Sequence, residues 1–186
     1  MILAAAALNA RTAMDFFLTA PQSLMIYADS ASRLDMRDYY ESGVTKGIES
    51  RLGKVRLDSV TPGTLHLKID SLSEMSLAVV PVRNDTVLAI METVRTPIAL
   101  SSIHIYNKDW TPRKEQPALP DAIAFGAPAY PGMFFVSVEY DAPTNTFRAI
   151  NNTKKYYLGG DVPEGVREMK DELRLRYDGR KFKAVR

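Results

Sequence analysis

The sequence predicts an α+β protein in which two short N-terminal helices precede a mainly antiparallel, hairpin-linked β-sheet. Apolar residues have helical spacing before Gly43. After Gly43, apolar and polar residues alternate with period two, as in strands. Consecutive strand-like runs are joined by short polar turns, without the strand–helix–strand alternation of parallel sheets. With 186 residues, 46% of them hydrophobic and 25% charged, the chain has the composition of an ordinary folded protein.

Residues 1–10 are apolar and rich in alanine. They are too few to cross a bilayer, which takes about 20 apolar residues. The pattern favours the remnant of a signal peptide, with small residues leading to a cleavage point after Ala10. The other interpretation is an alanine-rich first helical turn. We expect residues 11–186 to form a single α+β domain, whose only plausible subdivision is near residues 112–131, where prolines are frequent.

The first helix is predicted over residues 13–18. Thr12 can cap its N-terminus, and Asp15 lies in its first turn, where the helix dipole favours negative charge.

The second helix is predicted over residues 33–42. Ser32 and Asp35 have the spacing of a capping pair, and Gly43 suits the left-handed position after the helix end. The residues expected on its core-facing side are Leu34, Met36 and Tyr40.

Strands are predicted wherever apolar residues alternate or run together between polar turns. In chain order they cover residues 55–60, 64–69, 75–82, 86–94, 101–106, 133–140, 146–151, 173–177 and 180–185. The runs 75–82 and 86–94 are almost continuously apolar, which indicates central strands covered on both faces. Asp178-Gly179 predicts a two-residue type I′ turn between the last two strands, and residues 166–171 suit a helical turn before them.

Several segments together resemble a known family. They cover residues 33–43, 52–54, 77–82, 93–97 and 106–110. In these segments the chain resembles an uncharacterised family of exported proteins from Bacteroidales, a domain of unknown function. The resemblance implies a signal peptide and a sheet-rich fold, and it transfers no catalytic residue.

The charge balance and the absence of cysteine argue against several classes of function. The chain has 24 basic and 22 acidic residues, so its net charge of +2 gives no case for nucleic acid or an anionic membrane as partner. It has no cysteine, which excludes disulfides, thiol catalysis and cysteine-ligated metal sites.

The two histidines, His66 and His104, are the first candidates for chemistry. Each lies between apolar neighbours on a predicted strand, and the pair could meet only if the two strands were adjacent. A metal site would still need a carboxylate from elsewhere. The sequence favours solvent-facing or hydrogen-bonded histidines. It contains no Gly-x-Ser-x-Gly motif and no phosphate loop, so we predict no catalytic residue, no metal site and no cofactor.

The carboxylates of Asp35, Asp38 and Glu41 share one face of the second predicted helix. Paired carboxylates can serve acid–base chemistry or calcium binding. Arg33 and Arg37 interleave with them, which favours a solvated, self-paired helix face.

Two segments could form a binding surface. The C-terminal segment is rich in cations beside aromatic residues, a pattern that can bind single-stranded nucleic acid or anionic glycans. The alternation of Arg174 and Arg176 with leucines favours a charged outer strand face that blocks edge-to-edge pairing. The second candidate is the proline-rich connection with Trp110, Phe125 and Tyr130 as its recognition surface, and long ordered connections are often functional. Its aromatics could instead form a strap that covers the sheet, and the sequence favours that packing role.

Without a catalytic constellation, the sequence favours a non-enzymatic, exported binding or interaction module in the periplasm or cell envelope. Its expected partner is a protein or glycan of the envelope, and we expect no nucleic acid and no transmembrane segment. The alternative is a hydrolase or small-ligand carrier with a non-standard site.

Overall fold

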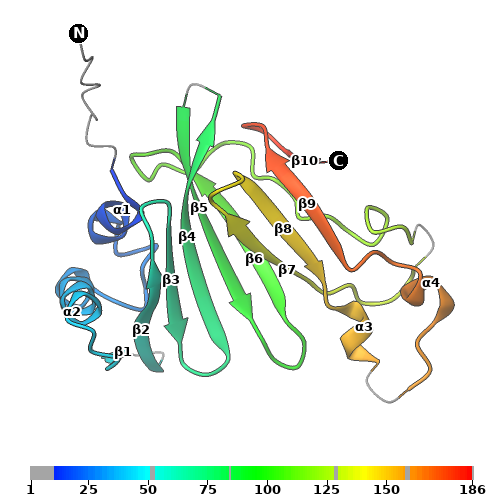
Figure 1. The fold of residues 1–186 in the computed structure, drawn as a ribbon, viewed down its shortest axis with the longest axis horizontal. Helices are drawn as coiled ribbons and strands as arrows, with labels where there is room; N and C mark the ends of the chain where they lie inside the picture. Colours follow the sequence, from blue (N-terminus) through cyan, green and yellow to red (C-terminus); the bar gives the residue numbers. More distant parts are fainter. Residues whose placement is uncertain (1–10, 51–52, 84, 128–129, 158–159, 186) are drawn as a thin grey trace, which may run out of the picture.

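The fold has three layers, formed by two helices, a six-stranded sheet and a four-stranded sheet (Figure 1). The computed structural model describes residues 11–50, 53–83, 85–127, 130–157 and 160–185. The predicted signal remnant, residues 1–10, lies outside the described residues. The predicted α+β class is confirmed.

The six-stranded sheet is an antiparallel meander in which every strand pairs with the next one along the chain. Its strands are β1 (Ile48–Ser50), β2 (Gly53–Val60), β3 (Thr64–Ile69), β4 (Ser73–Val82), β5 (Asp85–Val94) and β6 (Leu100–Tyr106). These strands agree closely with the predicted segments, and only the short β1 was not predicted. The alternating apolar residues of β3 all face one side and are buried, as expected for a strand with one covered face.

The four-stranded sheet is also antiparallel and has the order β10-β9-β8-β7. Its strands are β7 (Val136–Asp141), β8 (Thr146–Asn151), β9 (Glu172–Tyr177) and β10 (Phe182–Ala184). The sequence predicted one hairpin-linked sheet. The structure has two, because the proline-rich connection carries the chain from the edge strand β6 to a new sheet that packs on the first.

The first helix agrees with its prediction. Helix α1 (Ala13–Thr19) has Thr12 as its N-cap, and a complete capping box links Thr12 and Asp15. The Thr12 N–H donates to Oδ2 of Asp15 at 2.8 Å, and the Asp15 N–H donates to the Thr12 hydroxyl at 3.2 Å.

The second helix, α2 (Ser30–Glu41), begins earlier than predicted. The Asp29 carboxylate caps it by accepting from the Ser32 N–H at 2.8 Å, so the predicted Ser32–Asp35 capping pair is wrong. Aspartate is among the strongest N-capping residues, and here it takes the capping position three residues before Ser32. Gly43 has the predicted left-handed backbone, with φ +69°.

The core-facing side of α2 is also different from the prediction. Met36 is buried, but Leu34 is 45% exposed and Tyr40 37% exposed. Arg33 takes an inner position instead, where its Nη1 donates to the Ala20 carbonyl at 2.8 Å and its guanidinium lies 5.9 Å from the centre of the Phe17 ring.

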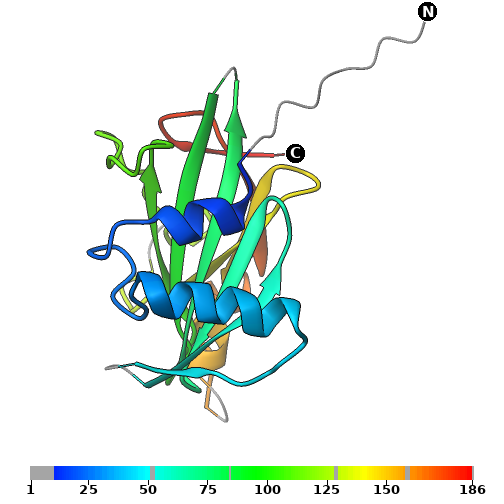
Figure 2. The ribbon, with the colours of Figure 1, turned by 90° about the vertical axis from the view of Figure 1, so that its left-hand side faces the viewer.

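The central strands of the six-stranded sheet are covered on both faces. Helices α1 and α2 lie across one face (Figure 2), where they bury the inner residues of β2 and β3. The four-stranded sheet packs on the opposite face of β4, β5 and β6. Successive residues of β4 therefore enter different cores, with Leu77 under the helices and Ala78 between the sheets. This confirms that the apolar runs 75–82 and 86–94 are central strands.

Two features of the C-terminal part were not predicted correctly. The short helices α3 (Thr153–Tyr156) and α4 (Glu164–Arg167) lie between β8 and β9, whereas one turn was predicted over residues 166–171. The β9–β10 hairpin pairs Tyr177 with Phe182, so its turn has four residues and not two. The Asp178 carboxylate stabilises this longer turn, because its Oδ1 accepts from the N–H groups of Arg180 and Lys181 at 3.0 Å each.

Candidate functional site

Two hairpin tips meet at one end of the molecule (upper end in Figure 1). One is the tip between β4 and β5, and the other is the turn between β9 and β10. Gly179, with φ +102°, makes the closest approach, because a Cβ atom there would lie only 3.1 Å from Cγ1 of Val82. Glycine is therefore required both by the backbone conformation and by the contact between the tips.

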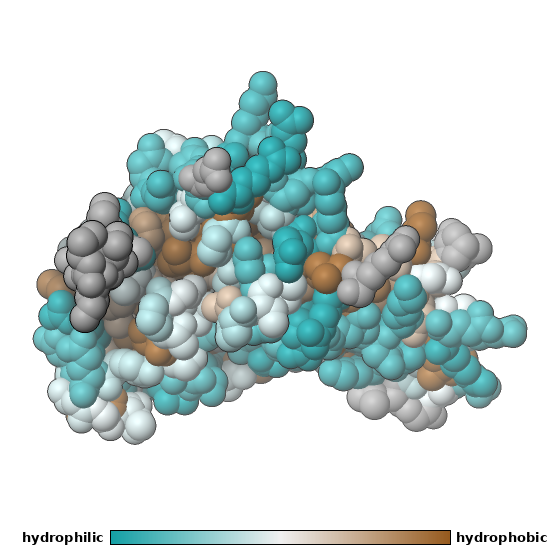
Figure 3. Space-filling view, turned by 45° about the horizontal axis from the view of Figure 1, so that its top comes forward, coloured by the Kyte–Doolittle hydropathy of each residue, from teal (hydrophilic) through white to brown (hydrophobic). Residues whose placement is uncertain are grey.

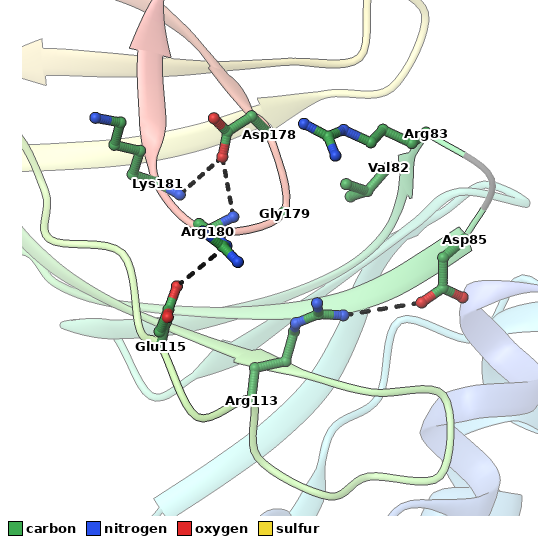
Figure 4. Close-up of a pocket in the computed structure, with 9 residues that line it drawn as sticks. All are labelled: Val82, Arg83, Asp85, Arg113, Glu115, Asp178, Gly179, Arg180 and Lys181. Carbon is green, nitrogen blue, oxygen red and sulfur yellow. Dashed lines mark hydrogen bonds and ion pairs between the residues drawn. The ribbon is translucent and has the colours of Figure 1, made fainter.

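The start of the proline-rich connection forms the third side of this site. It is held against the edge of β6, where the Arg113 N–H donates to the Ile105 carbonyl at 3.0 Å. The Gln116 side-chain amide continues the edge by bonding both backbone groups of Ile105, at 2.7 and 2.9 Å. These bonds place Arg113 and Glu115 beside the two tips (Figure 4).

The surface between these segments contains two adjoining hollows, with volumes of about 910 and 400 Å³. They share Val82, Arg83 and Asp178. We call them together the hairpin cleft, which is lined by Pro81, Val82, Arg83, Asp85, Arg113, Glu115, Asn145, Arg176, Tyr177, Asp178, Gly179, Arg180, Lys181, Lys183, Ala184 and Val185. Volumes of this order are typical of small-molecule sites, about 300–1,000 Å³.

The hairpin cleft concentrates positive charge. Six cationic side chains line it against three carboxylates, so its net excess is three, whereas the whole chain has a net charge of only +2. Figure 3, which brings this end of the molecule forward, shows a largely hydrophilic surface there. A concave surface lined by one sign of charge attracts ligands of the opposite sign.

The ion pairs of the cleft leave part of this charge uncompensated. Arg113 lies 3.8 Å from Asp85, and Arg180 lies 3.8 Å from Glu115, both at the outer limit of an ion pair (Figure 4). Among the described residues, Arg83 and Arg176 form no ion pair, and both line the smaller hollow. These two guanidinium groups are therefore free to bind an external anion.

The backbone of Arg83 is left-handed, with φ +51°, a conformation that costs a non-glycine residue about 1–2 kcal/mol. Asp70, Trp110 and Asn145 also have positive φ, so this conformation shapes the tip of the β4–β5 hairpin and is not by itself a sign of function.

Asp178 stabilises the β9–β10 turn at the edge of the cleft. Its carboxylate accepts backbone hydrogen bonds from Lys181 and Arg180 and lies 2.9 Å from Nζ of Lys183. These hydrogen bonds hold the pKa of the Asp178 carboxyl well below its usual range. The ionised carboxylate thus fixes the turn that presents Arg180 and Lys181.

A buried hydroxyl group also borders the cleft. Tyr177 is 3% exposed, and its hydroxyl has no hydrogen-bond partner among the described residues. Burial raises the pKa of Tyr177, so the hydroxyl keeps its proton and can donate a hydrogen bond. An unpaired buried hydroxyl costs about 1–3 kcal/mol, and this one lies inside the core between the sheets, on the face of β9 opposite to the exposed Arg176.

The three aromatic residues predicted as a recognition surface do not lie together. Trp110 is 7% exposed and packs under the helices, with its ring 6.4 Å from that of Phe16. Phe125 is fully buried in the core between the sheets. Tyr130 is half-buried, and its hydroxyl lies 2.9 Å from that of Tyr157. The buried rings of Trp110 and Phe125 pack in the two cores. This is the packing role that the sequence favoured over a recognition surface.

The two histidines do not meet. Strands β4 and β5 lie between β3 and β6. His66 lies on the inter-sheet side, where its Nδ1 is 2.7 Å from the Ser76 hydroxyl, and His104 pairs with Ile90, which faces the helices. The two side chains thus lie on opposite faces of the sheet and cannot form one centre. The described residues contain no cluster of three or more histidine, aspartate or glutamate side chains arranged for a metal ion.

The carboxylates of α2 are also apart from the cleft. Asp38 pairs with the neighbouring Arg37 at 2.7 Å, in agreement with the predicted self-paired helix face.

Sequence reasoning missed the hairpin cleft because its parts are far apart in the chain. It noted that the C-terminal segment is rich in cations but assigned Arg174 and Arg176 to edge protection. It left Arg83 in the polar turn between two predicted strands, with no role assigned. The usable signal was that cations occur in the turns of two hairpins, which can project from the same end of a sheet sandwich.

The arrangement defines the protein as a three-layer α+β sandwich with a cationic cleft at the hairpin end. The chain belongs to the family described as protein of unknown function DUF3256, whose model matches residues 5–182. This family membership confirms the predicted resemblance to uncharacterised Bacteroidales proteins.

Among solved structures, the chain is similar to a domain of an uncharacterised protein from Porphyromonas gingivalis W83. The TM-score is 0.71 at 17% sequence identity, covering 92% of this chain and 96% of that one. At this identity the match supports the fold alone. No curated protein matches the chain. None of these relationships indicates a specific function. Within the described residues, no helix combines the length and apolar character that spanning a membrane requires.

Proposed function

We propose that the protein is a non-enzymatic binding module that acts outside the cytoplasm, in the periplasm or cell envelope, and holds an anionic ligand in the hairpin cleft. The ligand belongs to a protein or glycan of the envelope, not to a nucleic acid. Residues 11–186 form the single functional unit, and residues 1–10 are what remains of its signal peptide.

The observation that carries the binding role is the pair of arginines, Arg83 and Arg176, that line one hollow without an ion-pair partner among the described residues. Arginine binds carboxylate and phosphate groups through two parallel N–H donors. The surrounding excess of positive charge raises the local concentration of anions.

Both histidines lie outside the cleft, on other parts of the sheet. The polar side chains that line the cleft belong to arginines, lysines, carboxylates, Asn145 and Tyr177. The sequence left a hydrolase as an alternative. A catalytic centre that contains both histidines is not possible in this fold, because their side chains do not meet. A small-ligand carrier would use the same cleft as a binding module.

Support for export comes from two sources. The composition of residues 1–10 suits the end of a signal peptide. The family resemblance also implies export. Cell fractionation of the native host tests this directly, and detection of the protein only in the cytoplasm would contradict it.

Titration calorimetry tests the binding role with a panel of anions, namely inorganic phosphate, a sulfated oligosaccharide and a carboxylated oligosaccharide. We expect saturable binding of at least one of them, lost in the double variant Arg83→Gln, Arg176→Gln. The control is Arg167→Gln on α4, an exposed arginine outside the cleft that forms no ion pair among the described residues. Equal losses in Arg167→Gln, or no binding of any anion, would refute the proposal.

A further inference from the structure

The hairpin cleft combines positive charge with carboxylates, and this mixture restricts the ligand. Asp85 and Glu115 line the larger hollow, and both are more than half exposed. Carboxylates repel phosphate and sulfate groups but accept hydrogen bonds from hydroxyls. A ligand that carries both an anion and hydroxyl groups fits this surface better than one that is only anionic.

The choice of cations favours a carboxylate as the anionic group. Four of the six cations are arginines, of which Arg83 and Arg176 line the smaller hollow without a carboxylate partner. The planar guanidinium matches the planar carboxylate with two parallel hydrogen bonds.

The smaller hollow also has apolar walls. They are formed by Pro81, Val82, Ala184 and Val185. Ligand sites commonly pair such apolar surface with a few polar groups that fix orientation. A sugar ring has an apolar face of C–H groups and a rim of hydroxyls, so it can contact these walls while its substituents reach the charged groups.

Resting on the proposed anion-binding function, we propose that the cleft binds the acidic sugar residues of a glycan, that is, uronate-type residues. The carboxylate lies between Arg83 and Arg176. The ring packs on Val82 and Ala184. The larger hollow accepts the next sugar, whose hydroxyls donate to Glu115 and Asp85.

The test is titration calorimetry with oligogalacturonate and with its methyl ester, which keeps the sugar rings and hydroxyls but loses the negative charge. We expect the acid to bind and the ester to bind at least about tenfold more weakly, since bonds to charged groups are the stronger ones. Arg83→Gln should weaken binding of the acid by about tenfold or more. Arg167→Gln should stay within about twofold of the unmodified protein, because it removes the same charge outside the cleft.

The outcomes separate this inference from the function on which it rests. If phosphate or the sulfated oligosaccharide binds in an Arg83-dependent manner and oligogalacturonate does not, the uronate assignment is wrong and the anion-binding function stands. Equal binding of the acid and the ester would also overturn the uronate assignment. If no anion binds in an Arg83-dependent manner, both proposals fail. Thermal unfolding of each variant shows whether a loss of binding comes from a loss of the fold.

Discussion

Replacing Phe125 by alanine tests the packing role of the proline-rich connection. Phe125 is fully buried between the two sheets, and its ring lies 5.3 Å from that of Phe134. Removing a fully buried phenylalanine from a core costs about 3–5 kcal/mol. For a chain of this size, each kcal/mol lowers the melting temperature by about 2–4 °C. We therefore expect Phe125→Ala to lower the melting temperature by about 6–20 °C.

The matched control lies two residues earlier in the same segment. Ile123 is 64% exposed, so Ile123→Ala should change the free energy of unfolding by no more than about 0.5 kcal/mol. Guanidinium unfolding followed by circular dichroism measures both variants. A loss below about 1 kcal/mol for Phe125→Ala, or equal losses for both variants, would show that the connection does not belong to the core.

Three further predictions concern other parts of the molecule. Arg33 is buried, and its Nε has no hydrogen-bond partner within the described part of the chain, so Arg33→Met should leave the free energy of unfolding within about 1 kcal/mol of the unmodified protein, while Arg33→Ala should lose about 2 kcal/mol or more. A similar loss in both variants would contradict this. Burial raises the pKa of Tyr140 from 10.0 to about 12, so the unfolded chain loses this proton first, and stability should fall from pH 10.0 to about 12. Tyr140→Phe should make that fall shallower, and an unchanged slope in pH-dependent urea unfolding would count against the assignment. Gly179→Ala should destabilise more than Gly126→Ala, because both have positive φ but only Gly179 approaches Val82. Equal melting temperatures would show that the tips do not touch.

Local parts of the fold could be predicted because their causes are local. The capping box of Thr12 and Asp15 and the alternation of β3 both depend on neighbouring residues, and both agree with the structure. The N-cap of α2 was missed because Asp29 and Ser32 are both good capping residues. The choice between them depends on how the chain leaves α1, where Arg33 bonds to the Ala20 carbonyl.

The division into two sheets and the hairpin cleft could not be predicted from local patterns. Alternation shows that a strand has a buried face, but it does not show which sheet covers that face. The cleft depends on the contact between Gly179 and Val82, which are almost a hundred residues apart, and on the bonds that hold Arg113 beside Ile105. Trp110 and Phe125 were named as part of a candidate recognition surface, but both are buried, and their burial follows from the packing of layers and not from their sequence neighbours.

Amide chemical-shift mapping during titration with oligogalacturonate tests the central claim most directly, because it locates the ligand without relying on a substitution. We predict that the largest shifts fall on Arg83, Arg176, Tyr177 and Gly179 and saturate with a single affinity. The amide shift of Tyr156, the exposed last residue of α3, should stay unchanged. Shifts concentrated away from the hairpin cleft, or spread evenly over the lysines and arginines of the surface, would contradict the account.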